Sequence, residues 1–155
     1  MRNSLRFLFW SLLSISLLAV LGCPPAPTKV NMVINAANNV NPDVGGQPLS
    51  VVVRIYQLKD KGRLETADYS AIWKSDKETL SDDLLERQER VIQPGTQEML
   101  EVQPNPSAAY LGVVALFRNP SGDTWRKIVP IEKGKTQKMS VTLQDQTVEV
   151  TAAAR

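Results

Sequence analysis

Alternating and continuous apolar runs divide the sequence from residue 30 onward into short segments with the period of β-strands. Val30, Met32 and Ile34 alternate with other positions, as is typical of a half-buried strand. The runs 49–58 and 110–117 are apolar on both faces, which favours central or covered strands. Short strands at this spacing, separated by turn residues, predict an antiparallel β-sandwich. The same pattern predicts further strands at 87–92, 97–102, 124–131, 136–143 and 148–150.

The period changes after the second predicted strand, which makes the fold all-β with a small helical insertion. Helical spacing of apolar residues predicts short helices at about 64–86, inside a β-sandwich domain that spans 30–151. Candidate N-caps for these helices are Thr66, Ser75 and Ser81. We expect the apolar side chains of the insertion to pack over the end of a sheet; they are Tyr69, Ile72, Trp73, Leu80, Leu84 and Leu85.

Two residues inside the most apolar runs are unusual for buried strands. Arg54 interrupts 49–58. A charge among apolar neighbours needs a partner, so we expect a carboxylate or carbonyl to pair with it in a structural role. Gly112 interrupts 110–117, which predicts close approach by another backbone or a large side chain.

The segment from Ala37 to Pro48 has the composition of a loop. It is rich in Asn, Gly and Pro, which favour turns by self-bonding, by positive φ and by removing backbone donors. It is longer than a tight hairpin requires, and long loops in compact domains are often functional or disordered. The residues alone leave open whether it is a passive connection or a functional loop.

The first 22 residues have the order of charge, apolar run and small residue that is typical of a secretory signal peptide. Arg2 and Arg6 precede an apolar run, Phe7–Leu21, that is interrupted by serines. It lacks the roughly 18 uninterrupted apolar residues expected of a membrane-spanning helix. The proline-rich segment 23–29 cannot continue a helix, so it is predicted to form an extended tether.

The end of this leader, Val20-Leu21-Gly22-Cys23, resembles the lipobox of bacterial lipoproteins. In that family a small residue before the cysteine lets the signal peptidase reach the bond, the thiol receives a diacylglyceryl group, and the new amino terminus is acylated. The resemblance implies recognition of Val20, Leu21 and Gly22 by the peptidase and lipidation of Cys23, with no other cofactor. Cys23 is the only cysteine, so no internal disulfide is possible. The alternative is an ordinary signal peptide with an incidental cysteine.

Charge and residue types narrow the function classes. The net charge of +2 equals the charge of Arg2 and Arg6, so the chain after cleavage is close to neutral. Nothing therefore indicates a nucleic-acid partner or an electrostatically held membrane surface. The absence of histidine excludes His-based triads and zinc sites with His ligands, and no metal site is predicted. Carboxylate pairs remain at Asp82-Asp83 and at Glu86 and Glu89, but such charges on a surface helix are usually solvated. We expect no catalytic residues and no enzyme.

Five segments behind the lipobox resemble one family. Together they are similar to the outer-membrane lipoprotein of the type VI secretion system, the TssJ (SciN-like) family. The likeness extends over nearly the whole mature chain and is carried by PLSVVVRIYQL (48–58), TADYSAIW (66–73), LERQERVIQPG (85–95), AYLGVVALFRNP (109–120) and TWRKIVPI (124–131).

The resemblance implies a transthyretin-like β-sandwich that is lipid-anchored in the outer membrane and faces the periplasm. It implies binding to the periplasmic C-terminal region of the inner-membrane TssM-like subunit of the trans-envelope complex, and no small-molecule substrate. Asp directly after the lipidated cysteine would retain a lipoprotein in the inner membrane; residue 24 is Pro, so outer-membrane sorting is predicted. The family binds its partner through the loop between the first two strands, here represented by Asn38, Asn39, Val40, Asn41, Pro42 and Asp43.

An alternative from another class is a periplasmic ligand- or carbohydrate-binding lipoprotein. Such a protein needs exposed aromatic side chains beside a groove. The aromatic residues of this chain mostly lie in core-like patterns: Tyr56, Tyr69, Trp73, Tyr110, Phe117 and Trp125.

Overall fold

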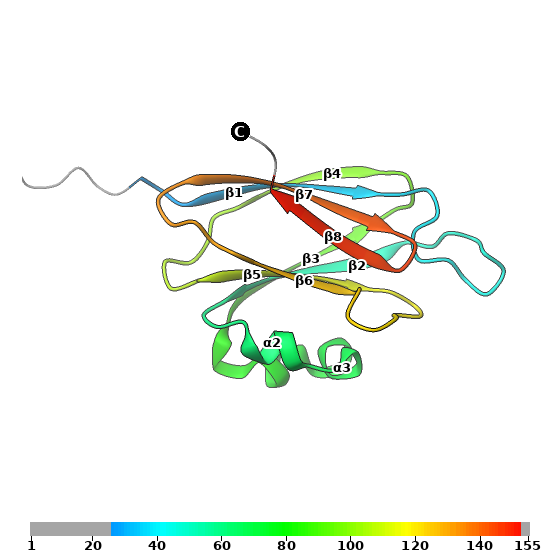
Figure 1. Ribbon diagram of the computed structural model, residues 1–155, viewed down its shortest axis with the longest axis horizontal. Coiled ribbons are helices and arrows are strands. Elements are labelled where there is room, and N and C mark those ends of the chain that lie inside the picture. Colours follow the sequence, from blue (N-terminus) through cyan, green and yellow to red (C-terminus); the bar gives the residue numbers. More distant parts are fainter. Residues whose placement is uncertain (1–25, 153–155) are drawn as a thin grey trace, which may run out of the picture.

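Two four-stranded sheets packed face to face form the domain (Figure 1). The computed structural model describes residues 26–152, so the predicted signal peptide and Cys23 lie outside the described residues. One sheet has the order β4-β1-β7-β8 and the other the order β3-β2-β5-β6. The strands are β1 (Lys29–Ala36), β2 (Val51–Leu58), β3 (Leu84–Ile92), β4 (Gln97–Val102), β5 (Tyr110–Leu116), β6 (Arg126–Pro130), β7 (Thr136–Gln144) and β8 (Thr147–Ala152).

The predicted antiparallel sandwich is confirmed with one exception. All neighbouring strands pair antiparallel except β1 and β7, which run parallel from Lys29↔Thr136 to Ala36↔Leu143. The chain crosses from β6 in one sheet to β7 in the other, and β7 starts at the same end of the sandwich as β1, where Lys29 pairs with Thr136. This pairing makes β1 an interior strand, with β4 on its other side.

The core lies between the sheets, and a second layer lies under the helices. In β1 the alternate residues Val30, Met32 and Ile34 are buried, as predicted. Val53 of β2 is buried between the sheets, and Tyr56 on the opposite face of the same strand is also fully buried. The reason is that the helices cover the outer face of the β3-β2-β5-β6 sheet (Figure 1). Burial on both faces explains why β2 and β5 read as continuous apolar runs.

The helical insertion begins and ends earlier than predicted. It contains α2 (Gly62–Thr66), α3 (Tyr69–Leu80) and the 3-10 turn η2 (Ser81–Asp83). β3 begins at Leu84, so the prediction of helix up to residue 86 was wrong. Leu84 pairs with Leu58, and the ladder between β2 and β3 then continues to the pair Val51↔Ile92. Pairing along the full length of β2 outweighs the local helical signals at Leu84, Leu85 and Glu86.

The N-caps predicted at Thr66 and Ser81 are wrong, whereas Ser75 lies at a break between two helical segments. Thr66 is the last residue of α2, where its hydroxyl donates to the Gly62 carbonyl at 2.9 Å, and α3 follows Asp68 instead. Ser75 marks a real break: its φ of −148° and ψ of 51° interrupt α3. Ser81 ends α3 with a φ of 46° and is the first residue of η2, not its cap.

The prediction for Gly112 is confirmed. A Cβ built on this residue would lie 2.4 Å from Cδ2 of Leu64, far inside contact distance. Leu64 comes from α2 and is fully buried. A glycine in β5 therefore lets α2 pack directly on the sheet.

Candidate functional site

The loop between β1 and β2 forms a closed hairpin, and its tip comprises residues 43–47. An isolated bridge between Pro42 and Pro48 joins its two sides. One carboxylate oxygen of Asp43 accepts from the backbone N–H of Gly45 at 2.8 Å and of Gln47 at 2.9 Å, and the Asp43 N–H donates to the Gln47 carbonyl at 2.9 Å. At the apex Val44 is 96% exposed. The loop is thus a preformed projection that presents an apolar side chain.

The base of this loop is fixed by Asn41. This residue is 5% exposed and has a φ of 50°, a left-handed conformation that asparagine tolerates. Its side chain donates to the Ser50 carbonyl at 2.8 Å and accepts from the Arg118 N–H at 2.7 Å. Its own N–H donates to the Asp145 carbonyl at 2.6 Å. Asn41 therefore connects three segments that are distant in sequence.

The residues predicted to bind the partner divide into two groups. Val40 is fully buried and Asn41 nearly so, so neither side chain is open to a partner. Asn38 and Asn39 are exposed, while Pro42 and Asp43 are half-buried. The prediction from the sequence included Asp43 but not Val44 or the other residues of the tip. The signal that could have found them is the short Asp-Val-Gly-Gly-Gln turn enclosed by two prolines.

A surface concavity of about 350 Å³, here called the Trp73 concavity, adjoins the loop base. Trp73 is 55% exposed, so its predicted place in the core was wrong. Tyr69, at the start of the same helix, is partly buried and forms an edge-on contact with Trp125, with ring centroids 5.2 Å apart. Burial raises the pKa of the Tyr69 hydroxyl. The lining residues are Asn41, Tyr69, Trp73, Leu116, Phe117 and Arg118.

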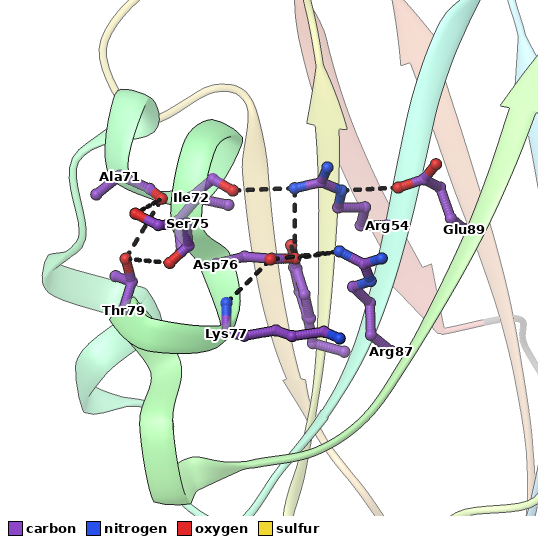
Figure 2. Close-up of polar contacts among 10 residues, drawn as sticks. Arg54, Ala71, Ile72, Ser75, Asp76, Lys77, Thr79, Arg87 and Glu89 are labelled. Carbon is purple, nitrogen blue, oxygen red and sulfur yellow. Dashed lines mark hydrogen bonds and ion pairs between the residues drawn. The ribbon is translucent and has the colours of Figure 1, made fainter.

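A partly buried polar network fastens α3 to the sheet (Figure 2). Arg54 donates to the Glu89 carboxylate at 2.9 Å and to the Ile72 carbonyl at 2.9 Å, and it lies 3.3 Å from the Asp76 carboxylate. This confirms the structural partner predicted for Arg54. Asp76 also accepts from the Tyr56 hydroxyl at 2.8 Å and from Arg87 at 3.0 Å.

The network holds Asp76 in its charged form. Burial by itself would raise the pKa of this carboxyl, but hydrogen bonds from Arg87 and Tyr56 and the charges of both arginines outweigh it, so the pKa lies below its ordinary value. For Tyr56, burial and the bond to Asp76 raise the pKa of the phenol. No buried side-chain N or O atom in residues 26–152 lacks a hydrogen-bond partner. This cluster therefore joins α3 to β2 and β3.

Three of the four carboxylates considered as catalytic candidates are engaged in structural contacts, and Asp82 is exposed. Asp83 pairs with Arg63 at 3.1 Å, Glu86 accepts from Gln57 at 3.0 Å, and Glu89 pairs with Arg54. No group of three or more possible metal-ligating residues occurs in the part of the chain that the structure describes. Within the same part, none of the helices has the length and apolar character needed to cross a bilayer.

The chain that forms these sheets, the insertion and the loop matches the model of a known family. The family model described as "Type VI secretion lipoprotein, VasD, EvfM, TssJ, VC_A0113" matches residues 28–146. The chain belongs to this type VI secretion lipoprotein family. The match includes the loop, the Trp73 concavity and the Arg54–Asp76 network, whereas Cys23 lies before it.

Solved structures support the assignment to the type VI secretion lipoproteins. The T6SS lipoprotein TssJ1 from Pseudomonas aeruginosa is 31% identical, with a TM-score of 0.79, over 83% of this chain and 98% of that chain. A chain from a structure described as "Type VI membrane complex" is 30% identical, with a TM-score of 0.71, over 83% and 99%. A chain from "T6SS protein TssM C-terminal domain (869-1107) from EAEC" is 27% identical, with a TM-score of 0.70, over 81% and 99%. No curated protein matches the chain significantly.

Proposed function

We propose that this type VI secretion lipoprotein is a non-enzymatic connector of the trans-envelope complex. Acyl groups on Cys23 anchor it in the outer membrane, and its β1–β2 loop holds the periplasmic C-terminal region of a TssM-like inner-membrane subunit. The family match and the likeness to chains from the membrane complex and from the TssM C-terminal domain structure support this assignment. Outer-membrane sorting would be tested by membrane fractionation of the acylated protein; recovery with inner-membrane markers would contradict it.

The observation that carries the docking proposal is the preformed hairpin tip. Its turn is closed by two bonds to Asp43, and its base is held by Asn41, so little conformational freedom remains to be lost on binding. Val44 at the apex supplies an apolar contact. Confinement of both proteins to one compartment raises their effective concentration, so a small interface is sufficient.

The test measures how tightly the Val44→Asp variant binds the purified periplasmic region of the TssM-like subunit. A charge at the apex must be desolvated on docking, so we expect affinity to fall at least tenfold with no change in thermal stability. The matched control is Met99→Asp, because Met99 is another exposed apolar residue, 83% accessible, on β4. Equal affinity of Val44→Asp, Met99→Asp and wild type would move the docking site away from the tip.

A second candidate function is binding of a small ligand or carbohydrate. It is favoured by one observation, the exposed Trp73 beside a concavity of about 350 Å³. Titration with peptidoglycan fragments, followed by tryptophan fluorescence, tests it. Saturable binding that Trp73→Ala abolishes would support a ligand-binding role, and a flat titration would leave the connector as the function.

A further inference from the structure

The amino-terminal end of the described chain is fastened to the sandwich only a few residues after Cys23. The backbone N–H of Lys29 donates to the Lys135 carbonyl at 3.0 Å, and the N–H of Gly134 donates to the Thr28 hydroxyl at 2.9 Å. Ala26, Pro27 and Thr28 line a concavity at this end of the molecule. The segment 23–29 was predicted to be a tether throughout, but its last residues lie along the folded domain and β1 already begins at Lys29.

The length of the remaining connection follows from covalent geometry. Ala26 is the third residue after Cys23, and a fully extended chain spans at most about 3.6 Å per residue, or about 11 Å in all. The polar layer of a bilayer is about 5–8 Å thick on each side of the hydrocarbon. A cysteine whose acyl chains are in the hydrocarbon therefore brings Ala26 to the outer limit of the headgroups.

The surface at this end of the sandwich suits such a position. We call it the tether end, and it comprises Thr28 with the segments 103–108 and 131–135. It surrounds a concavity of about 420 Å³ that includes Pro27, Pro104 and Pro106 in its lining. Lys133, at the rim of this concavity, is exposed and donates to the Pro106 carbonyl at 2.8 Å.

The charges around the tether end are nearly balanced. Lys135 pairs with Glu132 at 2.9 Å, and Lys29 pairs with Glu101 at 3.3 Å. With Lys133 these groups give three positive and two negative charges. Attraction to anionic phosphates is therefore modest, and the short connection to the acylated cysteine does most of the positioning.

The opposite end of the domain carries the hairpin tip. β1 leads from the tether end to the loop, and its eight residues span about 26 Å. In Figure 1 the start of β1 lies toward the left of the molecule and the cyan loop 37–50 at the far right. The sandwich thus separates the two ends along its long axis.

From this geometry we infer that the tether end rests directly on the phospholipid headgroups of the anchoring membrane, with Lys133 against their phosphates. The hairpin tip then projects away from that membrane. The inference rests on the proposed acylation of Cys23. In place of a domain held off the membrane by an extended tether, it describes one seated on the lipid surface in a fixed orientation.

The test measures the depth of two labels on the acylated full chain in vesicles of phosphatidylethanolamine and phosphatidylglycerol. Fluorophores are attached at Ser107→Cys, which lies in the tether end, and at Val44→Cys in the hairpin tip. A lipid with a spin-labelled headgroup serves as quencher. We expect the label at 107 to be quenched at least twofold more than the label at 44.

A length variant provides the control. Insertion of 15 Gly/Ser residues between Pro25 and Ala26 adds a coil with an end-to-end distance of about 20 Å. Quenching at 107 should then fall toward the level at 44 while the protein stays in the membrane. Equal quenching of the two labels in the native-length acylated chain, or quenching at 107 unaffected by the insertion, would overturn the inference and leave the connector function standing. A mass spectrum with an unmodified Cys23 would overturn both.

Discussion

The Asp76 network permits a quantitative prediction about stability. Asp76→Asn keeps the shape of the side chain but removes the charge that faces Arg54 at 3.3 Å and Arg87 at 3.0 Å. Loss of one partner from a buried ion pair costs about 3–5 kcal/mol. Here Glu89 still holds Arg54, and the Arg87 side chain is 32% exposed, so both arginines keep part of their stabilisation. We therefore expect a loss of about 2–3 kcal/mol in the free energy of unfolding.

For a domain of this size the loss corresponds to a decrease of about 10 °C in Tm. Thermal and urea unfolding, followed by circular dichroism, measures it. The matched control is Asp82→Asn, because Asp82 is an exposed aspartate in η2. A surface change of this kind should stay within about 0.5 kcal/mol. If the two variants are equally stable, Asp76 does not fasten α3 to the sheet in the way the geometry indicates.

The charge of Asp76 also predicts how stability depends on pH. The pKa of Asp76 in the folded protein lies below its ordinary value of 3.8. The stabilisation from its charge is therefore fully present above about pH 4 and is lost as the pH falls through the lower, folded-state pKa. The difference in unfolding free energy between wild type and Asp76→Asn should be constant near neutral pH and shrink in acid. A difference that grows on acidification would contradict the assignment.

Three further changes separate anchoring, packing and loop support. Cys23→Ser should leave the fold intact but release the protein from the membrane and abolish secretion; normal secretion at wild-type protein levels would exclude the anchor. Gly112→Val should cost about 1–3 kcal/mol in urea unfolding, because its side chain would overlap Leu64 of α2; unchanged stability would mean that α2 shifts freely. Asn41→Ala should lower the free energy of unfolding by about 1–3 kcal/mol, because it removes the hydrogen bonds of Asn41 to the Arg118 N–H and the Ser50 carbonyl. Asn41→Ala should also weaken partner binding. If the destabilised variant still binds the partner with wild-type affinity, the hairpin tip does not depend on Asn41 for binding.

The sequence predicted the strands well where a strand has a face that must be buried. The alternation in β1 and the continuous apolar runs of β2 and β5 follow directly from one-sided and two-sided burial. The parallel contact of β1 with β7 could not be predicted, because it joins segments more than a hundred residues apart and has no local signal.

The errors in the insertion and in the loop have a related physical cause. The signals at Thr66, Ser81 and Leu84 were read from neighbours in sequence, whereas pairing with β2 decides where β3 begins. Trp73 was assigned to the core by its spacing alone, but it faces solvent beside the loop base. In the loop, Asn-rich composition predicted a turn, but not that Asn41 is its buried anchor and Val44 its exposed apex.

The interior position of β1 has a mechanical consequence. In the proposed connector, tension between the two membranes would enter at one end of this strand and leave through the loop at the other. Because β4 and β7 flank β1 on both sides, such a pull would act along the strand and load the two hydrogen-bond ladders together instead of opening them one bond at a time. The lipoprotein would thus resist stretching along the direction in which the envelope would pull it.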